Sequence, residues 1–200
     1  MSETIAPPGL RERKKQATRR NIKQAALALA VDHGLEHLTV EAISEAADVS
    51  PRTFFNYFGC KEEALVGENE AVEAELRETI RDRPAGEPVL RTLRAAVGGS
   101  ESLRAADDRR EEAIARQRLV RDNPSLLPRQ LGKYAAYERA LCEALSERLG
   151  VDADADPRPA LLAALAVSVI RVAIRGWTAD GGRPLTDLVD EAFDVIEEGL

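Results

Sequence analysis

The 200-residue sequence is poor in the residues that build disulfide scaffolds, metal sites and β-sheets. It contains two cysteines, two histidines and only 4% aromatic residues. Two cysteines cannot form a disulfide framework, and their scarcity suits a reducing cytoplasm. Alanine and leucine supply most of the apolar side chains, and both favour helices over strands. The composition therefore predicts an all-α cytoplasmic protein.

Sequence signatures of membrane insertion and of catalysis are also missing. No run of about 18 apolar residues is free of charge, and the polar, then basic N-terminus lacks the apolar segment of a secretory signal. The two histidines, His33 and His37, have no cysteine or carboxylate partner at metal-binding spacing. The sequence contains neither a phosphate-binding glycine loop nor a nucleophile elbow. We therefore expect no membrane span, no metal site, no cofactor and no enzyme.

The net charge of −7 is divided unevenly along the chain. Residues 1–61 contain nine Lys and Arg against seven Asp and Glu, whereas the remainder contains 19 against 28. A small basic end suits DNA phosphates, and the acidic remainder does not. A disordered basic arm without a partner is the alternative. The first five of the following residues are our candidate phosphate contacts: Arg11, Arg13, Lys14, Lys15, Arg19, Arg20 and Lys23.

Glycine and proline divide the chain into about nine expected helices. Residues 1–9, which include Pro7 and Pro8, are expected to form a flexible tail. A first helix then runs to about His33, where Gly34 can end it. Two short helices follow, and the other six are expected over 61–81, 88–97, 101–122, 125–150, 158–179 and 185–198.

The two short helices have start signals only eleven residues apart. Thr39 can cap the first, and Ser50 can cap the second, with Pro51 at its first position. Between the two helices there is room only for a tight turn, which is typical of a helix-turn-helix. We therefore predict a helix-turn-helix domain over 10–60 and a second helical domain over 61–200.

The second short helix has an apolar and a polar face. Phe54 and Phe58 share the face that packs inward. On the other face an arginine can pair with guanine and an asparagine with adenine. A polar face that is merely solvated is the alternative. The outward residues are Arg52, Thr53, Asn56 and Tyr57, with Phe55 on the flank.

The segment from about Thr18 to Leu65 resembles the TetR family of bacterial regulators. The resemblance is carried by Leu38-Thr39-Val40-Glu41-Ala42-Ile43, by Ala46-Ala47-Asp48-Val49-Ser50-Pro51-Arg52-Thr53-Phe54-Phe55-Asn56-Tyr57-Phe58 and by Lys61-Glu62-Glu63-Ala64-Leu65. It implies an all-helical homodimer with an N-terminal DNA-binding domain and a C-terminal domain that dimerises and binds an effector. Members mostly repress transcription and release the operator when a small molecule binds.

The resemblance also implies roles for single residues. It places Thr39 and Val40 near the DNA backbone and Lys61 on a phosphate, where the start of a helix adds to the attraction. The family usually has a hydroxyl or amide cap at the position of Cys60, and a thiol caps more weakly. This thiol is either a redox switch near DNA or an incidental free thiol. The other implied DNA contacts are Arg52, Thr53, Phe55, Asn56 and Tyr57.

The sequence pattern of the C-terminal half predicts a dimer interface. Helix 158–179 is apolar nearly all round, so it needs cover on every face. Pairing it and helix 185–198 with their copies across a twofold axis makes a four-helix interface, as the family resemblance also implies.

Two arginines on this apolar helix, Arg171 and Arg175, need partners where they are partly buried. They either form structural ion pairs with acids such as Glu138 or Glu191, or one of them holds an anionic effector. Arg118-Leu119-Val120, Asn123-Pro124 and Arg175-Gly176-Trp177 look like the effector domains of TetR regulators associated with mycofactocin gene clusters, which implies fatty acyl-type ligands. Candidate pocket residues, each of which can belong to the core instead, are Leu103, Arg118, Tyr134, Tyr137, Arg171 and Trp177.

The expected protein is thus a ligand-responsive regulator, most simply a repressor, that binds a palindromic operator in double-stranded DNA as a homodimer. A helical scaffold without DNA binding would explain the acidic half but not the basic end. Activation in place of repression is also open. We expect a small, largely apolar effector with an acidic head to tilt helix 61–81 as one rigid rod. Its expected site lies between helices 61–81, 101–122, 125–150 and 158–179.

Overall fold

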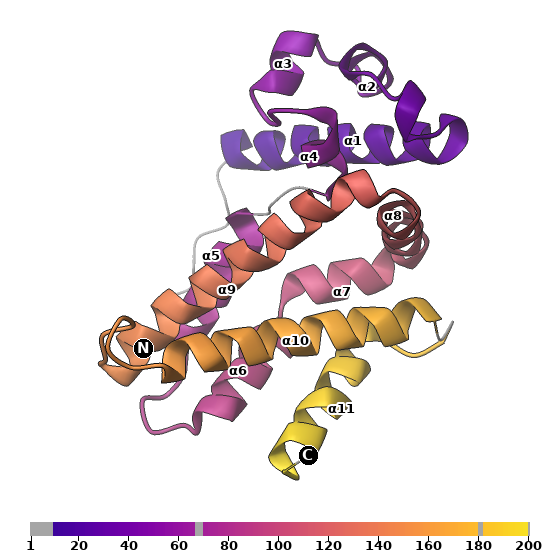
Figure 1. The fold of residues 1–200 in the computed structure, drawn as a ribbon. Coiled ribbons are helices and arrows are strands. Elements are labelled where there is room, and N and C mark those ends of the chain that lie inside the picture. The colour runs from indigo at the N-terminus through magenta and orange to yellow at the C-terminus, as the bar shows by residue number, and fades with distance from the viewer. Residues whose placement is uncertain (1–9, 67–69, 180–181, 200) are drawn as a thin grey trace.

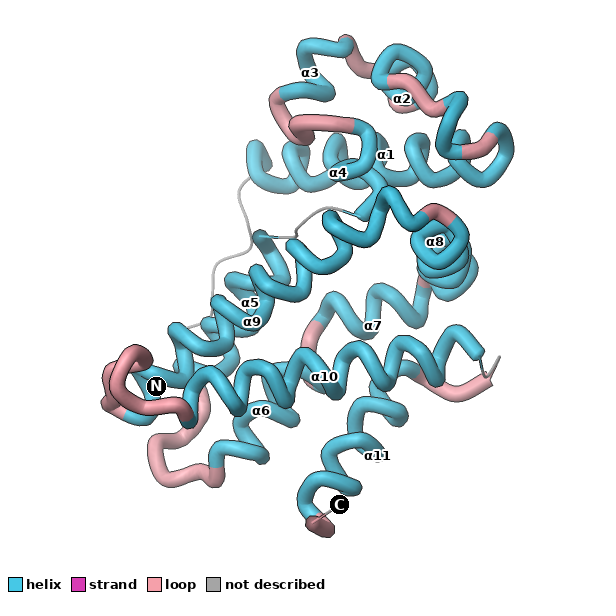
Figure 2. The backbone as a smooth tube through the Cα atoms, viewed as in Figure 1, coloured by secondary structure: helices cyan, strands magenta, loops and turns pink. Residues whose placement is uncertain are grey.

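The computed structural model describes residues 10–66, 70–179 and 182–199 (Figure 1). Every regular element within these ranges is a helix, as Figure 2 shows, so the all-α prediction is confirmed. The predicted tail, residues 1–9, lies outside the described residues. The elements are α1 (Leu10–His33), η1 (Leu35–His37), α2 (Val40–Ala46), α3 (Pro51–Phe55), α4 (Lys61–Val66), α5 (Glu70–Asp82), α6 (Val89–Gly98), α7 (Glu101–Asp108), α8 (Arg110–Asp122), η2 (Pro124–Leu126), α9 (Leu127–Leu149), α10 (Arg158–Ala179) and α11 (Leu185–Glu197), where η marks a short 3-10 helix.

The nine predicted helical segments are found as eleven described α-helices, because two segments are divided. The segment 101–122 is interrupted at Arg109, whose φ of −119° and ψ of 43° are not helical. Figure 1 shows α7 lying across the page and α8 nearly end-on. The segment 61–81 contains α4 and α5, and residues 67–69 between them lie outside the described ranges. The single rigid rod that we expected over 61–81 is therefore not found as one described helix.

Two hydrophobic cores divide the molecule into a head, made of α1–α4, and a body, made of α5–α11. The head core contains Phe54 and Phe58 from the region of α3. It also contains Leu119 and Val120 from α8 and Leu126 from η2, all of them buried. Helix α8 therefore belongs to the body along the chain but completes the core of the head.

Helix α10 crosses the body and is apolar along most of its length. Its mean hydropathy reaches 1.7, so by length and composition alone it could cross a membrane. The side chains of Ala166, Val169, Ile170 and Ala173 are buried in the body core, where α10 packs against α9, α6 and α11. A buried core helix passes the same test of length and composition, but packing within one chain covers only part of α10, because 39% of its apolar window is buried and Leu161 and Val172 stay exposed.

The turn between α2 and α3 contains the one non-glycine residue with a positive φ in the described ranges, Asp48, at 53°. The Asp48 N–H donates to the Glu45 carbonyl at 3.1 Å, and the Val49 N–H donates to the Ser44 carbonyl at 2.9 Å. These two bonds make a Schellman motif, which ends α2 and redirects the chain toward α3. An aspartate tolerates this left-handed conformation, but with a strain that glycine avoids.

We expect Asp48→Gly to stabilise the protein by about 0.5–1 kcal/mol, because glycine adopts a positive φ without strain. Urea denaturation followed by circular dichroism measures the change. The matched control is Glu45→Gly, in the last turn of α2, which should destabilise by about 1 kcal/mol because glycine is a poor helix former. If both variants lost stability, the backbone of Asp48 would not be strained in the wild type.

Candidate nucleic-acid interface and effector pocket

Helix α3 is held in one orientation by its cap and by two buried rings. The Ser50 hydroxyl accepts the Thr53 N–H at 3.0 Å, and the Thr39 hydroxyl caps α2 in the same way at 3.1 Å. Both predicted caps are confirmed. Phe54 and Phe58 are 0% and 1% exposed, so the inner face of α3 is fixed against the head core.

The opposite face of α3 points away from the head core. Arg52, Phe55 and Asn56 are exposed, with Phe55 at 57%. Thr53 and Tyr57 are half-buried, and the Thr53 hydroxyl is hydrogen-bonded to the cap of α3 at 2.9 Å. Figure 1 places α2 and α3 at the end of the molecule far from α11. The candidate base contacts therefore lie on a surface that a DNA groove can reach.

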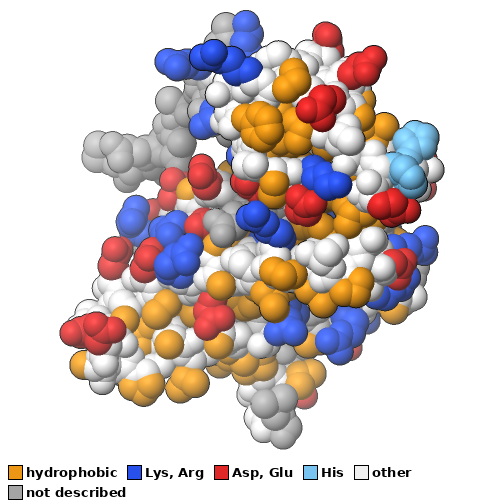
Figure 3. Space-filling model, turned by 45° about the horizontal axis from the view of Figure 1, so that its top comes forward, with side chains coloured by type: hydrophobic (Ala, Val, Ile, Leu, Met, Phe, Trp, Pro, Cys, Tyr) orange, Lys and Arg blue, Asp and Glu red, His pale blue; other side chains and the backbone are white. Residues whose placement is uncertain are grey.

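The candidate phosphate contacts of α1 fall into two groups. Arg19 packs its guanidinium 4.7 Å from the centre of the Phe58 ring and donates to the Tyr57 carbonyl at 3.3 Å. Arg19 thus joins α1 to the residues that directly follow α3. Figure 3 shows basic side chains gathered at one edge of the head. The exposed group, in the first turns of α1, consists of Arg11, Arg13, Lys14 and Lys15.

The side chain of Lys61 is hydrogen-bonded within the head. Its ammonium donates to the carbonyls of Leu35, at 3.2 Å, and Leu38, at 2.7 Å. Both carbonyls belong to the turn that leads into α2, where Thr39 is exposed and Val40 packs against the head core. The structure therefore gives Lys61 a contact that positions α2, which the sequence did not indicate.

Glu63, in the first turn of α4, reaches back to the chain that precedes the helix. The Glu63 carboxylate accepts the Gly59 N–H at 2.7 Å. The thiol contacts the body, where the Arg129 guanidinium donates to the Cys60 sulfur at 3.4 Å. The Glu63 bond thus ties the turn before α4 to its first turn, while the thiol of Cys60 is engaged with Arg129.

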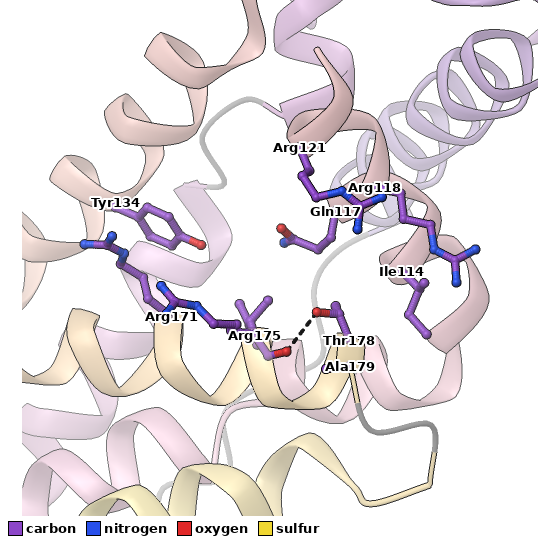
Figure 4. Close-up of a pocket in the computed structure, with 10 residues that line it drawn as sticks. Ile114, Gln117, Arg118, Arg121, Tyr134, Arg171, Arg175, Thr178 and Ala179 are labelled. Atoms are coloured by element: carbon purple, nitrogen blue, oxygen red, sulfur yellow. Dashed lines mark hydrogen bonds between the residues drawn. The ribbon is translucent and has the colours of Figure 1, made fainter. Parts of the chain in front are cut away.

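A pocket of about 410 Å³ opens between α8, α9 and α10 (Figure 4). Three of the predicted effector contacts line it, namely Arg118, Tyr134 and Arg171. Figure 4 shows side chains of α8 and α10 on opposite sides of the pocket, with Tyr134 of α9 beside Arg171. Four arginines make this pocket strongly basic. It is lined by Ile114, Gln117, Arg118, Arg121, Tyr134, Arg171, Ile174, Arg175, Thr178 and Ala179.

The positive charge of the pocket is only partly balanced by the protein. Arg121 pairs with Asp122 at 2.8 Å. In the part of the chain that the structure describes, no carboxylate forms an ion pair with Arg118, Arg171 or Arg175. All three side chains are exposed, so their charge is open to solvent and within reach of an anionic ligand.

The partial burial that we expected for Arg171 and Arg175 is not found, because both side chains are exposed, and neither pairs with Glu138 or Glu191 in the described residues. Glu191 pairs with Arg183 at 2.7 Å, and Glu138 lines a separate groove on α9. The sequence could not exclude these pairs, because helix periodicity does not say which helices face each other across the body.

Tyr134 gives the pocket a hydrogen-bonding group. Burial raises the pKa of the Tyr134 phenol, although Gln130, which donates to the phenol oxygen at 3.0 Å, and the Arg171 guanidinium act in the opposite direction. The guanidinium carbon of Arg171 lies 5.8 Å from the centre of the ring. The phenol is thus protonated at neutral pH and can donate a hydrogen bond.

The other three predicted effector contacts lie in the body core and do not line this pocket. Leu103 packs against the core, and Tyr137 and Trp177 are buried within it. The guanidinium of Arg110 lies 4.7 Å from the centre of the Trp177 ring and donates to the Trp177 carbonyl at 2.8 Å. Large aromatic side chains suit a core and a pocket equally, so the sequence could not separate the two roles.

Helix periodicity points to several residues of the pocket wall that we did not predict from the sequence. Ile114 and Arg121 lie four residues before and three residues after Arg118, which places all three on one face of α8. Ile174 follows Arg171 by three residues and shares its face of α10 in the same way.

Comparisons with known proteins agree with these features. Residues 22–66 match the family described as bacterial regulatory proteins, tetR family, and residues 87–200 match the MftR C-terminal domain. The chain is 38% identical to the HTH-type transcriptional regulator TcmR of Streptomyces glaucescens, over 96% of this chain and 84% of TcmR.

Solved structures share the fold. The fold is similar to that of the fatty acid degradation regulator FadR from Bacillus halodurans, with a TM-score of 0.60 and 21% identity; the match covers 90% of this chain and 98% of FadR. It is also similar to Thermus thermophilus FadR, a TetR-family repressor solved with lauroyl-CoA, with a TM-score of 0.52, 24% identity, and coverage of 91% and 94%.

We expect Lys61→Met to destabilise the protein by about 1–3 kcal/mol, because it leaves two carbonyls without their charged donor. Thermal unfolding followed by circular dichroism checks this. Lys15→Met, which removes an exposed ammonium from α1, is the matched control and should change stability by less than about 0.5 kcal/mol. If Lys61→Met kept its stability and lost only affinity for DNA, Lys61 would be a phosphate contact and not a positioning residue.

Proposed function

Because the chain belongs to the TetR family of bacterial transcriptional regulators, we propose that it is a cytoplasmic repressor that leaves its operator when an anionic, acyl-type molecule binds in the body. It is a transcriptional regulator and not an enzyme. The observation that carries the proposal is the arrangement of α3, whose two phenylalanines are buried and whose Arg52 and Asn56 point outward.

The proposed DNA contacts follow from that outer face. Arg52 can pair with guanine and Asn56 with adenine in the major groove, and the hydroxyl of the half-buried Tyr57 can donate to a phosphate. A single short helix reads too few base pairs for specific binding. Two copies about 34–36 Å apart would read successive turns of the major groove, so the proposed operator is an imperfect palindrome.

The proposed dimer forms through α10 and α11. Leu161 and Val172 on α10 are 67% and 58% exposed, and Val195 on α11 is 46% exposed. Exposed aliphatic side chains on neighbouring helices suit burial against the same helices of a second copy.

The proposed effector site is the basic pocket between α8, α9 and α10. Arg118, Arg171 and Arg175 favour a ligand with a negative charge, and the pocket wall also offers Ile114 and Ile174 to an apolar part. The lauroyl-CoA of Thermus thermophilus FadR combines an anionic and an apolar part, which supports this class of ligand. A long-chain acyl-CoA is thus the first compound to test.

We expect Asn56→Ala to weaken binding of the selected operator by about 1–3 kcal/mol and to relax one base position per half-site. Arg13→Ala should instead weaken every duplex alike and flatten the salt dependence of binding, because it removes a phosphate contact. Selection from a random DNA pool gives the operator, and fluorescence anisotropy gives the affinities. Arg139→Ala, on the exposed face of α9, is the control. Equal, sequence-independent losses for the Asn56 and Arg13 variants would contradict the assigned roles.

We expect lauroyl-CoA to displace the protein from the operator, and Arg171→Gln to raise the required concentration by about tenfold or more, since a hydrogen bond between charged groups contributes about 1.5–3 kcal/mol. Anisotropy of labelled operator follows the release, and Arg139→Gln should behave as the wild type. Tight binding of the compound without any change in operator affinity would contradict release by this effector class. If the Arg171→Gln variant responded as the wild type does, Arg171 would not bind the effector.

A further inference from the structure

Helices α9 and α10 present a face of the body that the described part of the chain leaves open. Both helices lie on the side of the body that faces the viewer in Figure 1, and Figure 3 shows hydrophobic side chains across the body surface. Leu131 of α9 is 60% exposed, as much as Val172 of α10 at 58%. Exposed aliphatic side chains gathered on one face indicate a contact surface.

The outward residues of the two helices form one stripe on each helix. They follow one another at steps of three and four residues, so each stripe lies on one helix face. Each side chain in the stripes is exposed or half-buried, and each stripe contains a single charged residue among apolar and small ones. The stripe of α9 is Leu131, Ala135, Glu138 and Cys142, and the stripe of α10 is Leu161, Leu165, Ser168, Val172 and Arg175.

The two charged residues of the stripes, Glu138 and Arg175, lack a counter-charge in their own chain. Among the residues that the structure describes, neither forms an ion pair, whereas the nearby Glu143 of α9 pairs with Arg77 of α5 at 2.9 Å. Glu138 lines the groove beside α9, and Arg175 lines the effector pocket. One unpaired acid and one unpaired base therefore lie on the same open face.

Glu138 and Arg175 lie on opposite sides of one contact between α9 and α10. At this contact the guanidinium carbon of Arg171 lies 5.8 Å from the centre of the Tyr134 ring. Glu138 follows Tyr134 by four residues, and Arg175 follows Arg171 by four. The helices run in opposite directions, so at a rise of about 1.5 Å per residue the two positions are about 12 Å apart along the pair. This separation is too long for an ion pair within one chain.

A twofold axis through the Tyr134–Arg171 contact exchanges these two positions. Half a turn about an axis perpendicular to the face brings Arg175 of one copy over Glu138 of the other, and the reverse pair forms at the same time. A twofold interface requires this kind of self-complementary surface. A second copy of this chain therefore matches both the charges and the apolar residues of the face.

We propose that two copies of the chain pack face to face through α9 and α10, with Glu138 of each copy ion-paired to Arg175 of the partner subunit. The inference rests on the dimer of the proposed function and extends its interface from α10 onto α9. Because Arg175 lines the effector pocket, the partner copy contributes a carboxylate to the rim of that pocket.

Sedimentation equilibrium of the full chain measures the dissociation constant of the dimer. We expect Glu138→Arg and Arg175→Glu each to raise it by about a hundredfold, because each reversal turns two ion pairs of the dimer into contacts between like charges, at about tenfold per contact. Both variants should melt as the wild-type monomer does, since neither side chain has an ion-pair partner among the described residues. The matched control is Arg91→Glu, at an exposed position of α6, which should dimerise as the wild type does.

Mixing the two variants separates this ion pair from a general effect of charge. In a mixed dimer one contact joins the two reversed residues and the other joins the two native ones. The equimolar mixture and the double variant should therefore both regain a dissociation constant within about tenfold of the wild type.

If the single variants dimerised as the wild type does, or if their mixture stayed monomeric, the Glu138–Arg175 pair would be overturned while a dimer through α10 and α11 would stand. If the wild type itself stayed monomeric, a different partner would cover this face, and both the pair and the proposed dimer would be overturned.

Discussion

The structure depends on helix α8 being shared between two parts of the molecule. On one face, Leu119 and Val120 are buried with Phe54 and Phe58 in the head core. Burying an aliphatic side chain of this size contributes about 1.5–3 kcal/mol, so the head is not a complete unit without α8. On another face, the same helix lines the basic pocket with Arg118 and its neighbours. A ligand in that pocket would touch a helix that cannot shift without disturbing the core behind α3.

This arrangement changes the route by which the two parts can communicate. The sequence suggested a single rod over 61–81, which the structure describes as two helices. The break at Arg109 gives α8 a direction different from that of α7. Because of this direction, one face of α8 packs against the head and another face lines the pocket. For the release by an effector that we propose, the packing supports a path across one short helix, α8, between side chains about one helix diameter apart.

The basic residues show how tertiary contacts assign different roles to the same kind of side chain. Arg52 lies exposed on the outer face of α3, whereas Arg19 packs on Phe58 and Lys61 donates to two carbonyls of the head. All three are positive residues of a basic end, and nothing local in the sequence separates them. The difference arises from what lies opposite each side chain in the folded head.

Much of the architecture could be predicted from local signals in the sequence. The caps at Thr39 and Ser50, the end of α1 at Gly34 and the burial of Phe54 and Phe58 all follow from interactions within a few residues, and each is found as predicted. Helix starts, helix ends and amphipathic faces depend on neighbours that are close along the chain. What the sequence alone determined is therefore most of the helices, the helix-turn-helix and the outward face of α3, but not the division of the segments 61–81 and 101–122 into two helices each. Only the tertiary structure decided that Trp177 belongs to the core while Arg171 lines a pocket, that Lys61 holds the head together, and that α8 completes a core begun by residues about a hundred positions earlier. These outcomes depend on which helices pack against one another, and contacts between residues that far apart in sequence leave no periodic or capping signal in the chain.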